Sequence, residues 1–186
     1  MSNQSNVSIA KDRETPYVNQ RSRRGRCDLV GDEIYVRCLK YANEFSRITS
    51  ERLFPPYKVY TWQAKTFHPQ TNTYMYMGLY GGANGWIDFR CIDTTIRCSS
   101  SNNGSGSTNT TITGVNATWN VNAPKVFKID WEAGRIRFYV DGNLVATHST
   151  NIPSSAMPFF VKVENQSTDP AHEAGIDYKA RSLVVT

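Results

Sequence analysis

The stretch KVFKIDWEAGRIRFYVDGNLV, residues 125–145, contains the clearest structural signal in this chain of 186 residues. Apolar and polar side chains alternate along Val126–Trp131 and again along Arg135–Val140, as expected of strands with one buried face. Asp-Gly at 141–142 then separates the second run from Leu144–Ser149, and this dipeptide is a strong signal for a tight hairpin turn. Consecutive antiparallel strands are therefore predicted, with Trp131 and Tyr139 in the core.

Short strand-like runs separated by turn residues continue on both sides of this stretch. The other predicted strands are Glu33–Leu39, Tyr57–Phe67, Tyr74–Tyr80, Trp86–Cys91, Ile96–Ser99, Phe159–Glu164 and Ile176–Val185. The only helical element expected is a short turn at Tyr41–Ile48, and the polar segment 99–118 is expected to be a loop. No apolar run reaches the roughly 18 residues that a membrane helix needs. The pattern predicts an all-β sandwich.

Residues 1–26 differ in composition from the rest of the chain. They hold six basic and two acidic residues, which gives +4 of the total net charge of +5. Residues 27–186 therefore carry only +1, too little for the basic surface typical of a folded nucleic-acid-binding domain. We predict a polar N-terminal arm at 1–26 and one domain at 27–186.

The arm ends in a cluster of arginines, namely Arg21, Arg23, Arg24 and Arg26. A polar segment of this length seldom folds alone. Four interpretations stay open: a solvated tail, an anchor on an acidic partner surface, a nucleic-acid contact and a processing site.

The stretch 125–145 resembles the concanavalin-like lectin and glucanase superfamily, and is most similar to the laminarinases and lichenases of glycoside hydrolase family 16. The segments 54–67, 86–91 and 175–185 are similar to further strands of that family, in the same order. The resemblance covers residues 27–186. It implies a concanavalin-like jelly-roll β-sandwich of two antiparallel sheets, here with an extended N-terminal arm.

One strand of that family carries the motif Glu-x-Asp-x-(x)-Glu, and two carboxylates flanking the glycosidic bond perform the chemistry. The matching strand here is WIDFRC, residues 86–91. Asp88 matches the middle acid, whereas Trp86 stands at the first glutamate and Arg90 or Cys91 at the last. Arg90 is expected to keep Asp88 ionised, the opposite of what a general acid needs. We therefore predict no catalytic residues and a protein that is not an enzyme.

Aromatic residues on and near this strand form a candidate carbohydrate site. Strand alternation places Trp86, Asp88 and Arg90 on one face, and it places Tyr76 and Tyr80 on one face of their own strand. The candidate sugar contacts are Trp86, Asp88, Arg90, Tyr76, Tyr80 and Trp119. The alternative is that these rings cover the second face of the sandwich or pack against another subunit.

The four cysteines, Cys27, Cys38, Cys91 and Cys98, lack the spacing of a zinc site. A two-residue turn at Thr94–Thr95 would place Cys91 opposite Cys98, which suits a disulfide, and buried free thiols are the alternative. In the resembling family the position of Asp177 often supplies a calcium ligand. The resemblance thus implies a structural calcium ion, and no other cofactor is expected.

Three functions are consistent with these patterns. The leading hypothesis is a structural, assembly or surface-display subunit, such as a virion decoration or fibre protein, that associates with itself or with a larger particle through its arm. The second is a lectin that binds a glycan on the concave face. The third is a diverged glycoside hydrolase, in which Asp88 would need a second acid such as Glu132 or Asp93. No signal peptide is recognisable, and we expect a location on a virion or an extracellular surface, without membrane insertion.

Overall fold

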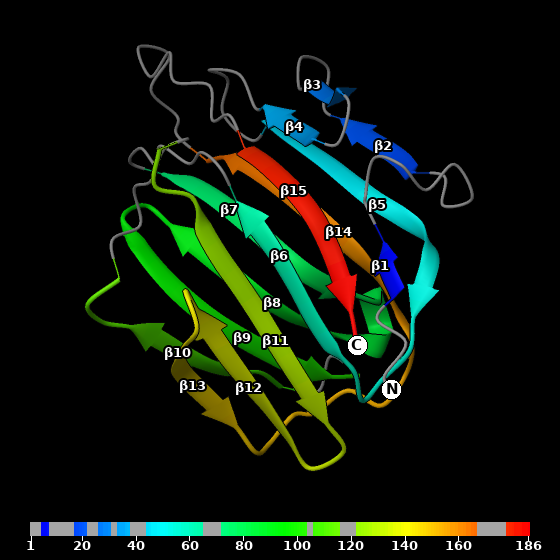
Figure 1. Cartoon of the computed structure of the whole chain (residues 1–186), viewed down its shortest axis with the longest axis vertical. Coiled ribbons are helices and arrows are strands. Elements are labelled where there is room, and N and C mark those ends of the chain that lie inside the picture. The colour runs from blue at the N-terminus through cyan, green and yellow to red at the C-terminus, as the bar shows by residue number, and fades with distance from the viewer. Residues whose placement is uncertain are drawn as a thin grey trace.

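Alternating inward and outward side chains build two antiparallel β-sheets, which pack face to face in this computed structural model (Figure 1). The structure describes residues 5–7, 17–21, 26–30, 33–37, 44–64, 72–103, 106–115, 122–166 and 178–186. Within these ranges there is one short 3-10 helix, η1 (Gly82–Asn84), and no helix long and apolar enough to cross a membrane. The predicted all-β jelly-roll sandwich is confirmed.

The first sheet has the strand order β13-β12-β11-β6-β15-β4-β3, and β1 pairs with the last residues of β15, Leu183–Val185. Its strands are β1 (Ser5–Val7), β3 (Arg26–Val30), β4 (Glu33–Arg37), β6 (Val59–Ala64), β11 (Lys125–Glu132), β12 (Arg135–Val140), β13 (Asn143–His148) and β15 (Tyr178–Val185). The predicted hairpin at Asp141-Gly142 joins β12 to β13, and both turn residues have positive φ as that turn requires.

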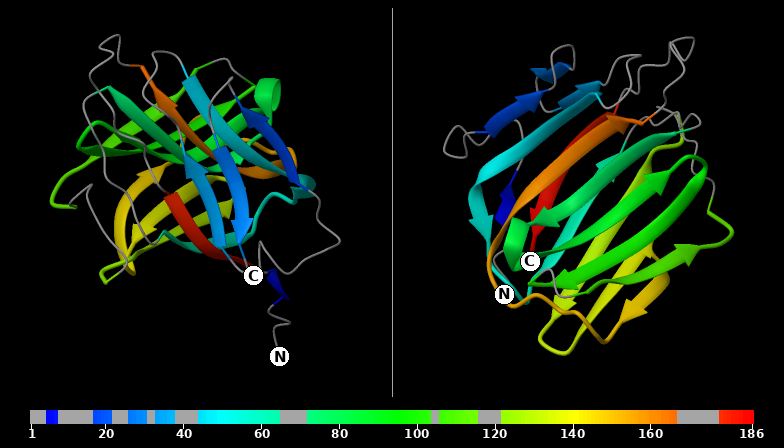
Figure 2. Two further views of the ribbon diagram at one scale, coloured as in Figure 1. Left: turned by 90° about the horizontal axis from the view of Figure 1, so that it is seen from above. Right: turned by 180° about the vertical axis from the view of Figure 1, so that it is seen from behind.

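The second sheet has the order β10-β9-β8-β7-β14-β5-β2. Its strands are β2 (Tyr17–Arg21), β5 (Glu44–Phe54), β7 (Thr73–Tyr80), β8 (Gly85–Ile92), β9 (Thr95–Asn102), β10 (Thr108–Ile112) and β14 (Met157–Asn165). Figure 2 shows the two layers from above in its left view and the second sheet from behind in its right view. The outer face of this sheet carries the candidate site.

Aromatic rings from both sheets form the centre of the core. Trp62 of β6 stacks on Phe127 of β11 and meets Phe89 of β8 and Phe159 of β14 at steep angles, with ring centroids 5.3–6.1 Å apart. Such pairs contribute about 0.5–1.5 kcal/mol each beyond the burial of their area. These contacts fix β8 and β14 firmly on the first sheet, so the outer face of the second sheet has a rigid base.

Every predicted strand coincides with an observed one, but three local expectations are wrong. Tyr41–Ile48 contains no described helix, because strand β5 begins at Glu44. Segment 99–118 is not one loop, since β9 extends to Asn102 and β10 follows at Thr108. Trp131 is buried in the core as predicted, whereas Tyr139 lies on the outer face of the first sheet with Lys128 Nζ 4.4 Å from its ring centre.

The predicted cysteine pairing is also wrong: Cys91 and Cys98 are buried free thiols. The turn between β8 and β9 lies at Asp93–Thr94, one residue earlier than expected, so Cys91 faces Ile96 and Cys98 faces Phe89. Asp93 takes a positive φ of 53°, a conformation that aspartate tolerates better than threonine. Cys27 lies in β3, but its side chain, and the whole of Cys38, are outside the described residues.

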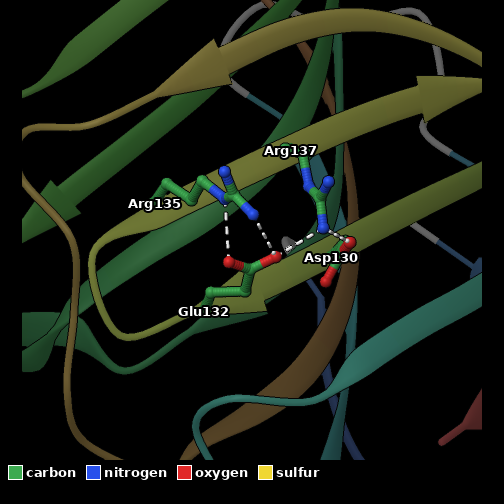
Figure 3. Close-up of polar contacts among 4 residues, drawn as sticks. All are labelled: Asp130, Glu132, Arg135 and Arg137. Atoms are coloured by element: carbon green, nitrogen blue, oxygen red, sulfur yellow. Dashed lines mark hydrogen bonds and ion pairs between the residues drawn. The ribbon is translucent and has the colours of Figure 1, made fainter.

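The outer face of the first sheet carries a compact set of ion pairs (Figure 3). Arg137 contacts Asp130 at 2.6 Å and also Glu132, and Arg135 Nε donates to Glu132 Oε2 at 2.8 Å. We call these four residues on the β11–β12 hairpin the ion-pair cluster. Each arginine in it has at least one carboxylate partner.

Candidate functional site

A cleft of about 270 Å³ opens on the outer face of the second sheet, over strands β5, β7, β8 and β14. It is lined by Phe45, Arg47, Tyr76, Tyr80, Asp88, Arg90, Phe160 and Lys162. These side chains gather because every second residue of each strand points outward and the strands are neighbours in the sheet. We call this set the cleft.

Strand register places four charged or aromatic residues in one row across the cleft. Arg90 is opposite Tyr76, Tyr76 is opposite Lys162, and Lys162 is opposite Arg47. Adjacent strands are about 4.8 Å apart, so neighbouring residues of the row are spaced by about this distance across the cleft floor. Arg97 continues it beyond Arg90 on β9.

The parallel row next to it contains Asp88, Gly78 and Phe160 in register. Gly78 has a φ of +147°, and a Cβ there would lie 2.3 Å from Ile87 O and 2.9 Å from Asp88 Cα. The close approach of β7 to β8 beneath the cleft therefore requires glycine at this position.

Asp88 is the one carboxyl group among the described lining residues, and it is almost completely buried, with 1% of its surface exposed. Arg90 Nε donates to its Oδ1 at 2.8 Å. Burial raises the pKa of Asp88 to about 6, and the attraction and hydrogen bond of Arg90 only partly counteract this effect. Asp88 is thus paired with Arg90 as expected, but desolvation outweighs the ion pair, so its pKa is raised and not lowered.

Arg90 is held in place by the aromatic residues around it. Its guanidinium carbon lies 5.4 Å from the ring centre of Tyr76 and 5.3 Å from that of Trp86. Trp86 in turn donates from Nε1 to Ser99 Oγ at 2.9 Å. The contacts fix both the cation and the indole beside Asp88, which is the arrangement of a preformed polar site.

Lys162 and Tyr76 form the middle of the cleft. Lys162 Nζ binds Glu164 Oε2 at 2.7 Å and lies 5.2–5.3 Å from the ring centres of Phe45 and Tyr76. Burial, with the nearby Glu164 charge, raises the pKa of Tyr76 to about 12, so its hydroxyl stays protonated and can donate or accept a hydrogen bond.

Arg47 closes the far side of the cleft in a different manner. Its guanidinium carbon lies 4.7 Å from the ring centre of Tyr80 and 5.3 Å from that of Phe160, and its Nε donates to Thr49 Oγ1. No carboxylate among the described residues pairs with it. Burial lowers the pKa of Arg47, although the group remains a cation at neutral pH.

Five of the six predicted sugar contacts are therefore brought together: Tyr76, Tyr80, Asp88 and Arg90 line the cleft, and Trp86 packs beside Arg90. Trp119, Asp177, Arg23 and Arg24 lie outside the described residues, as do the side chains of Arg21 and Arg26. No group of three potential metal ligands occurs in the described part of the chain. Neither acid suggested as a partner of Asp88 lines the cleft, since Glu132 is on the other sheet and Asp93 is in a turn.

Sequence reasoning missed half of the cleft, namely Phe45, Arg47, Phe160 and Lys162. Lys162 and Phe160 lie in a predicted strand, so alternation could have placed them on one face. For β5 the signal is hidden, because the buried positions include Ser46 and Ser50 while Phe45 faces outward.

The two packed antiparallel sheets define a concanavalin-like jelly roll, and comparison with solved structures finds the same fold. The chain matches a Bacillus licheniformis β-glucanase over 100% of its own length and 99% of the other chain, with a TM-score of 0.74 and 14% identity. It matches a β-1,3-1,4-glucanase (lichenase) from a mouse hindgut metagenome over 96% of both chains, with a TM-score of 0.73 and 11% identity.

A third match is the catalytic domain of an endo-1,3-β-glucanase (laminarinase) from Thermotoga petrophila, which covers 86% of this chain and 79% of that one, with a TM-score of 0.64 and 14% identity. No family profile and no curated protein matches the sequence. The resemblance to the glucanases is thus confirmed in the fold, at identities too low to carry more than the fold.

These comparisons contradict the prediction that the chain is not an enzyme, because the three structures named above that share its fold are two β-glucanases and a laminarinase. That prediction depended on the missing glutamates of strand β8 and on an ionised Asp88. The second premise holds in part: Asp88 is paired with Arg90, but its burial raises its pKa to about 6, so a fraction of the carboxyl groups is protonated near neutral pH.

Proposed function

We propose that the cleft binds a glycan chain across strands β5, β7, β8 and β14. The observation that carries this proposal is the composition of the cleft: aromatic rings and fixed polar groups converge in one hollow of a rigid sheet. Ligand sites generally combine apolar or aromatic walls with a few placed polar groups. Tyr76 and Tyr80 offer ring faces to sugar C–H groups, while Arg90 and Lys162 offer hydrogen-bond donors to sugar hydroxyls.

The comparisons support a glycan as the ligand and suggest the first ones to test. The matching structures are named as a β-glucanase, a β-1,3-1,4-glucanase and an endo-1,3-β-glucanase. Soluble laminarin and lichenan are therefore the appropriate starting probes for this chain.

Affinity electrophoresis or titration calorimetry with these glucans tests the proposal. We expect binding that falls by about tenfold in Tyr76→Ala, because a central aromatic contact contributes more than about 1.4 kcal/mol. Tyr139→Ala is the matched control, since Tyr139 is also a half-buried tyrosine next to a lysine, but on the other sheet. An equal loss of glucan affinity in both variants, or no glycan binding by the wild-type chain, would count against the proposal.

A second function, hydrolysis of the bound glycan, is favoured by the protonation of Asp88. A carboxyl group with a pKa of about 6 can donate its proton to the glycosidic oxygen near neutral pH. In that step the bond between the anomeric carbon and the glycosidic oxygen breaks, and the leaving oxygen takes the Asp88 proton. A water molecule then adds its hydroxyl to the anomeric carbon and returns its other proton to Asp88.

Most glycosidases use two carboxyl groups, and Asp88 is alone among the described lining residues. The exceptions include enzymes in which the substrate itself assists, so the substrate panel should include glycans with N-acetylated sugars. Release of reducing ends that is lost in Asp88→Asn, while glycan binding is retained, would support hydrolysis. Equal turnover in Asp88→Asn and wild type would rule out this role for Asp88.

A further inference from the structure

The cleft carries more positive charge than its carboxylates neutralise. The row across the sheet contains four cations, Arg97, Arg90, Lys162 and Arg47. Two carboxylates are paired with members of this row, Asp88 with Arg90 and Glu164 with Lys162. The difference leaves a net charge of +2 when Asp88 is ionised, and more when it is protonated.

Arg47 and Lys162 are directly opposite each other on β5 and β14. Like charges in opposed positions destabilise a sheet. Lys162 is partly compensated by Glu164, but Arg47 has no carboxylate among the described residues. Among the described residues, therefore, nothing supplies a negative group at the Arg47 end of the cleft.

The position of Arg47 is well defined, and its hydrogen-bonding capacity is incompletely used. The rings of Tyr80 and Phe160 hold the guanidinium, and Nε is engaged by Thr49 Oγ1. The two terminal nitrogens donate to no described residue, and they have the fork geometry that suits a carboxylate or sulfate. Burial also disfavours the charged form of Arg47, and a bound anion would favour it.

We propose that the cleft selects glycans that carry negative charge, with a sulfate or carboxylate of the sugar chain bound by Arg47 and Lys162. This inference rests on the proposed glycan-binding function and deepens it. The aromatic faces of Tyr76 and Tyr80 bind the sugar rings, and the cation row fixes the register of the charged substituents. Neutral glucans bind the same surface more weakly.

The test is calorimetry of the full chain at fixed salt with three probes: a sulfated polysaccharide (dextran sulfate), a carboxylated one (polygalacturonate) and neutral laminarin. We expect at least one charged glycan to bind tighter than laminarin by about tenfold or more, since charge-assisted hydrogen bonds are the strong ones. The sulfated and carboxylated arms identify which anion the cleft prefers.

Variants locate this preference at Arg47. Arg47→Gln should bring the affinity for the charged glycan down to within about twofold of the affinity for laminarin measured with the same variant. Arg47→Lys should restore part of the difference, because the charge returns without the fork. Arg135→Gln, in the ion-pair cluster of the other sheet, is the control, and it should change neither the affinity for the charged glycan nor the affinity for laminarin. Thermal melts verify that each variant is folded.

Four results would overturn the inference. Equal affinity for laminarin and both charged glycans would leave the glycan-binding function standing but remove charge selection. Equal losses of affinity for the charged glycan in Arg47→Gln and Arg135→Gln would show that the preference depends on the overall charge of the protein. Tighter binding of a single-stranded RNA than of either charged glycan would assign the cation row to phosphate. Absence of binding to every glycan would instead overturn the proposed function as well.

Discussion

Arginines on the two outer faces of this sandwich have very different surroundings. In the ion-pair cluster of the first sheet, Arg135 and Arg137 are bound by Glu132 and Asp130 on the same hairpin (Figure 3). In the cleft of the second sheet, Arg47 is held by rings and a threonine hydroxyl. On the first face every arginine of the cluster has a carboxylate partner, whereas Arg47 on the other face has none among the described residues.

This difference separates charges that are neutralised by neighbouring side chains from charges available to a ligand. The two arginines and two carboxylates of the ion-pair cluster make that surface locally neutral. Exposed ion pairs stabilise a protein little, typically by less than about 1 kcal/mol. The cleft combines a buried acid, fixed cations and aromatic rings in one hollow. The predictions below compare equivalent changes on the two faces.

The largest effect is expected at Gly78. Gly78→Ala places a methyl group 2.3 Å from Ile87 O in a backbone conformation that alanine avoids, so we expect a loss of about 4 kcal/mol in unfolding free energy and loss of glycan binding. Gly134→Ala, in the β11–β12 turn, is the control because its Cβ would meet no atom within 4 Å. Urea denaturation measures both, and similar stabilities for the two variants would contradict the close strand approach described for the cleft.

Removing one arginine from each face should give the next largest contrast. Arg90→Ala leaves the buried Asp88 without its partner, and we expect a loss of about 3 kcal/mol at pH 8. The loss should shrink at pH 5, where Asp88 is mostly protonated. Arg135→Ala breaks an exposed pair and should cost about 0.5 kcal/mol or less at either pH. Chemical denaturation at both pH values checks this, and equal costs would remove the distinction between the faces.

Asp88 should also give the cleft a pH-dependent stability. Its pKa is raised from 3.8 to about 6, so the folded state holds the proton more tightly than the unfolded state does. Unfolding free energy is therefore expected to fall by about 2–3 kcal/mol as the pH rises from about 4 through 6. Asp88→Asn should abolish this fall. A wild-type profile that rises over the same range, unchanged by the substitution, would contradict the buried position of Asp88.

The smallest change is expected at His148, which links β13 to the second sheet away from the cleft. Its Nδ1 lies 2.9 Å from Ser100 Oγ and its Nε2 3.0 Å from Thr110 Oγ1, and burial lowers its pKa below 6.5. The unfolded state takes up the proton first, so His148 should reduce stability as the pH falls below 6.5, opposite in sign to Asp88. The effect can be measured from melting temperatures over this pH range in Asp88→Asn, where the opposite effect of Asp88 is removed. It should vanish in the double variant that also carries His148→Gln.

The sequence was sufficient to predict the sandwich because most of its strands have one apolar face. The run from Lys125 to Val145 alternates so regularly that both strands and the Asp-Gly turn are where they were expected. The grouping of Trp86, Asp88 and Arg90 followed from the same alternation, with Ile87, Phe89 and Cys91 turned to the core. Local periodicity therefore determines which residues share a face.

The features that the sequence did not predict depend on contacts between residues far apart along the chain. Ser99 and Ser100 resemble part of a polar loop, but their hydroxyls are satisfied by Trp86 and His148, so they lie buried in a strand. Arg47 joins Lys162 through pairing across more than 100 residues, which no local pattern reveals. The raised pKa of Asp88 depends on burial by this tertiary packing, and sequence alone suggested only the opposing effect of Arg90.

The measurement that tests the central claim most directly is ¹⁵N NMR mapping of the chain titrated with a glycan oligosaccharide, first a β-glucan and then a sulfated or carboxylated one. The account predicts saturable shifts at Tyr76, Arg90, Lys162 and Arg47, with the Arg47 shifts larger for the charged ligand. The residues of the ion-pair cluster should not shift. Shifts confined to the β11–β12 hairpin, or none for any glycan, would contradict the assignment of the cleft as the glycan site.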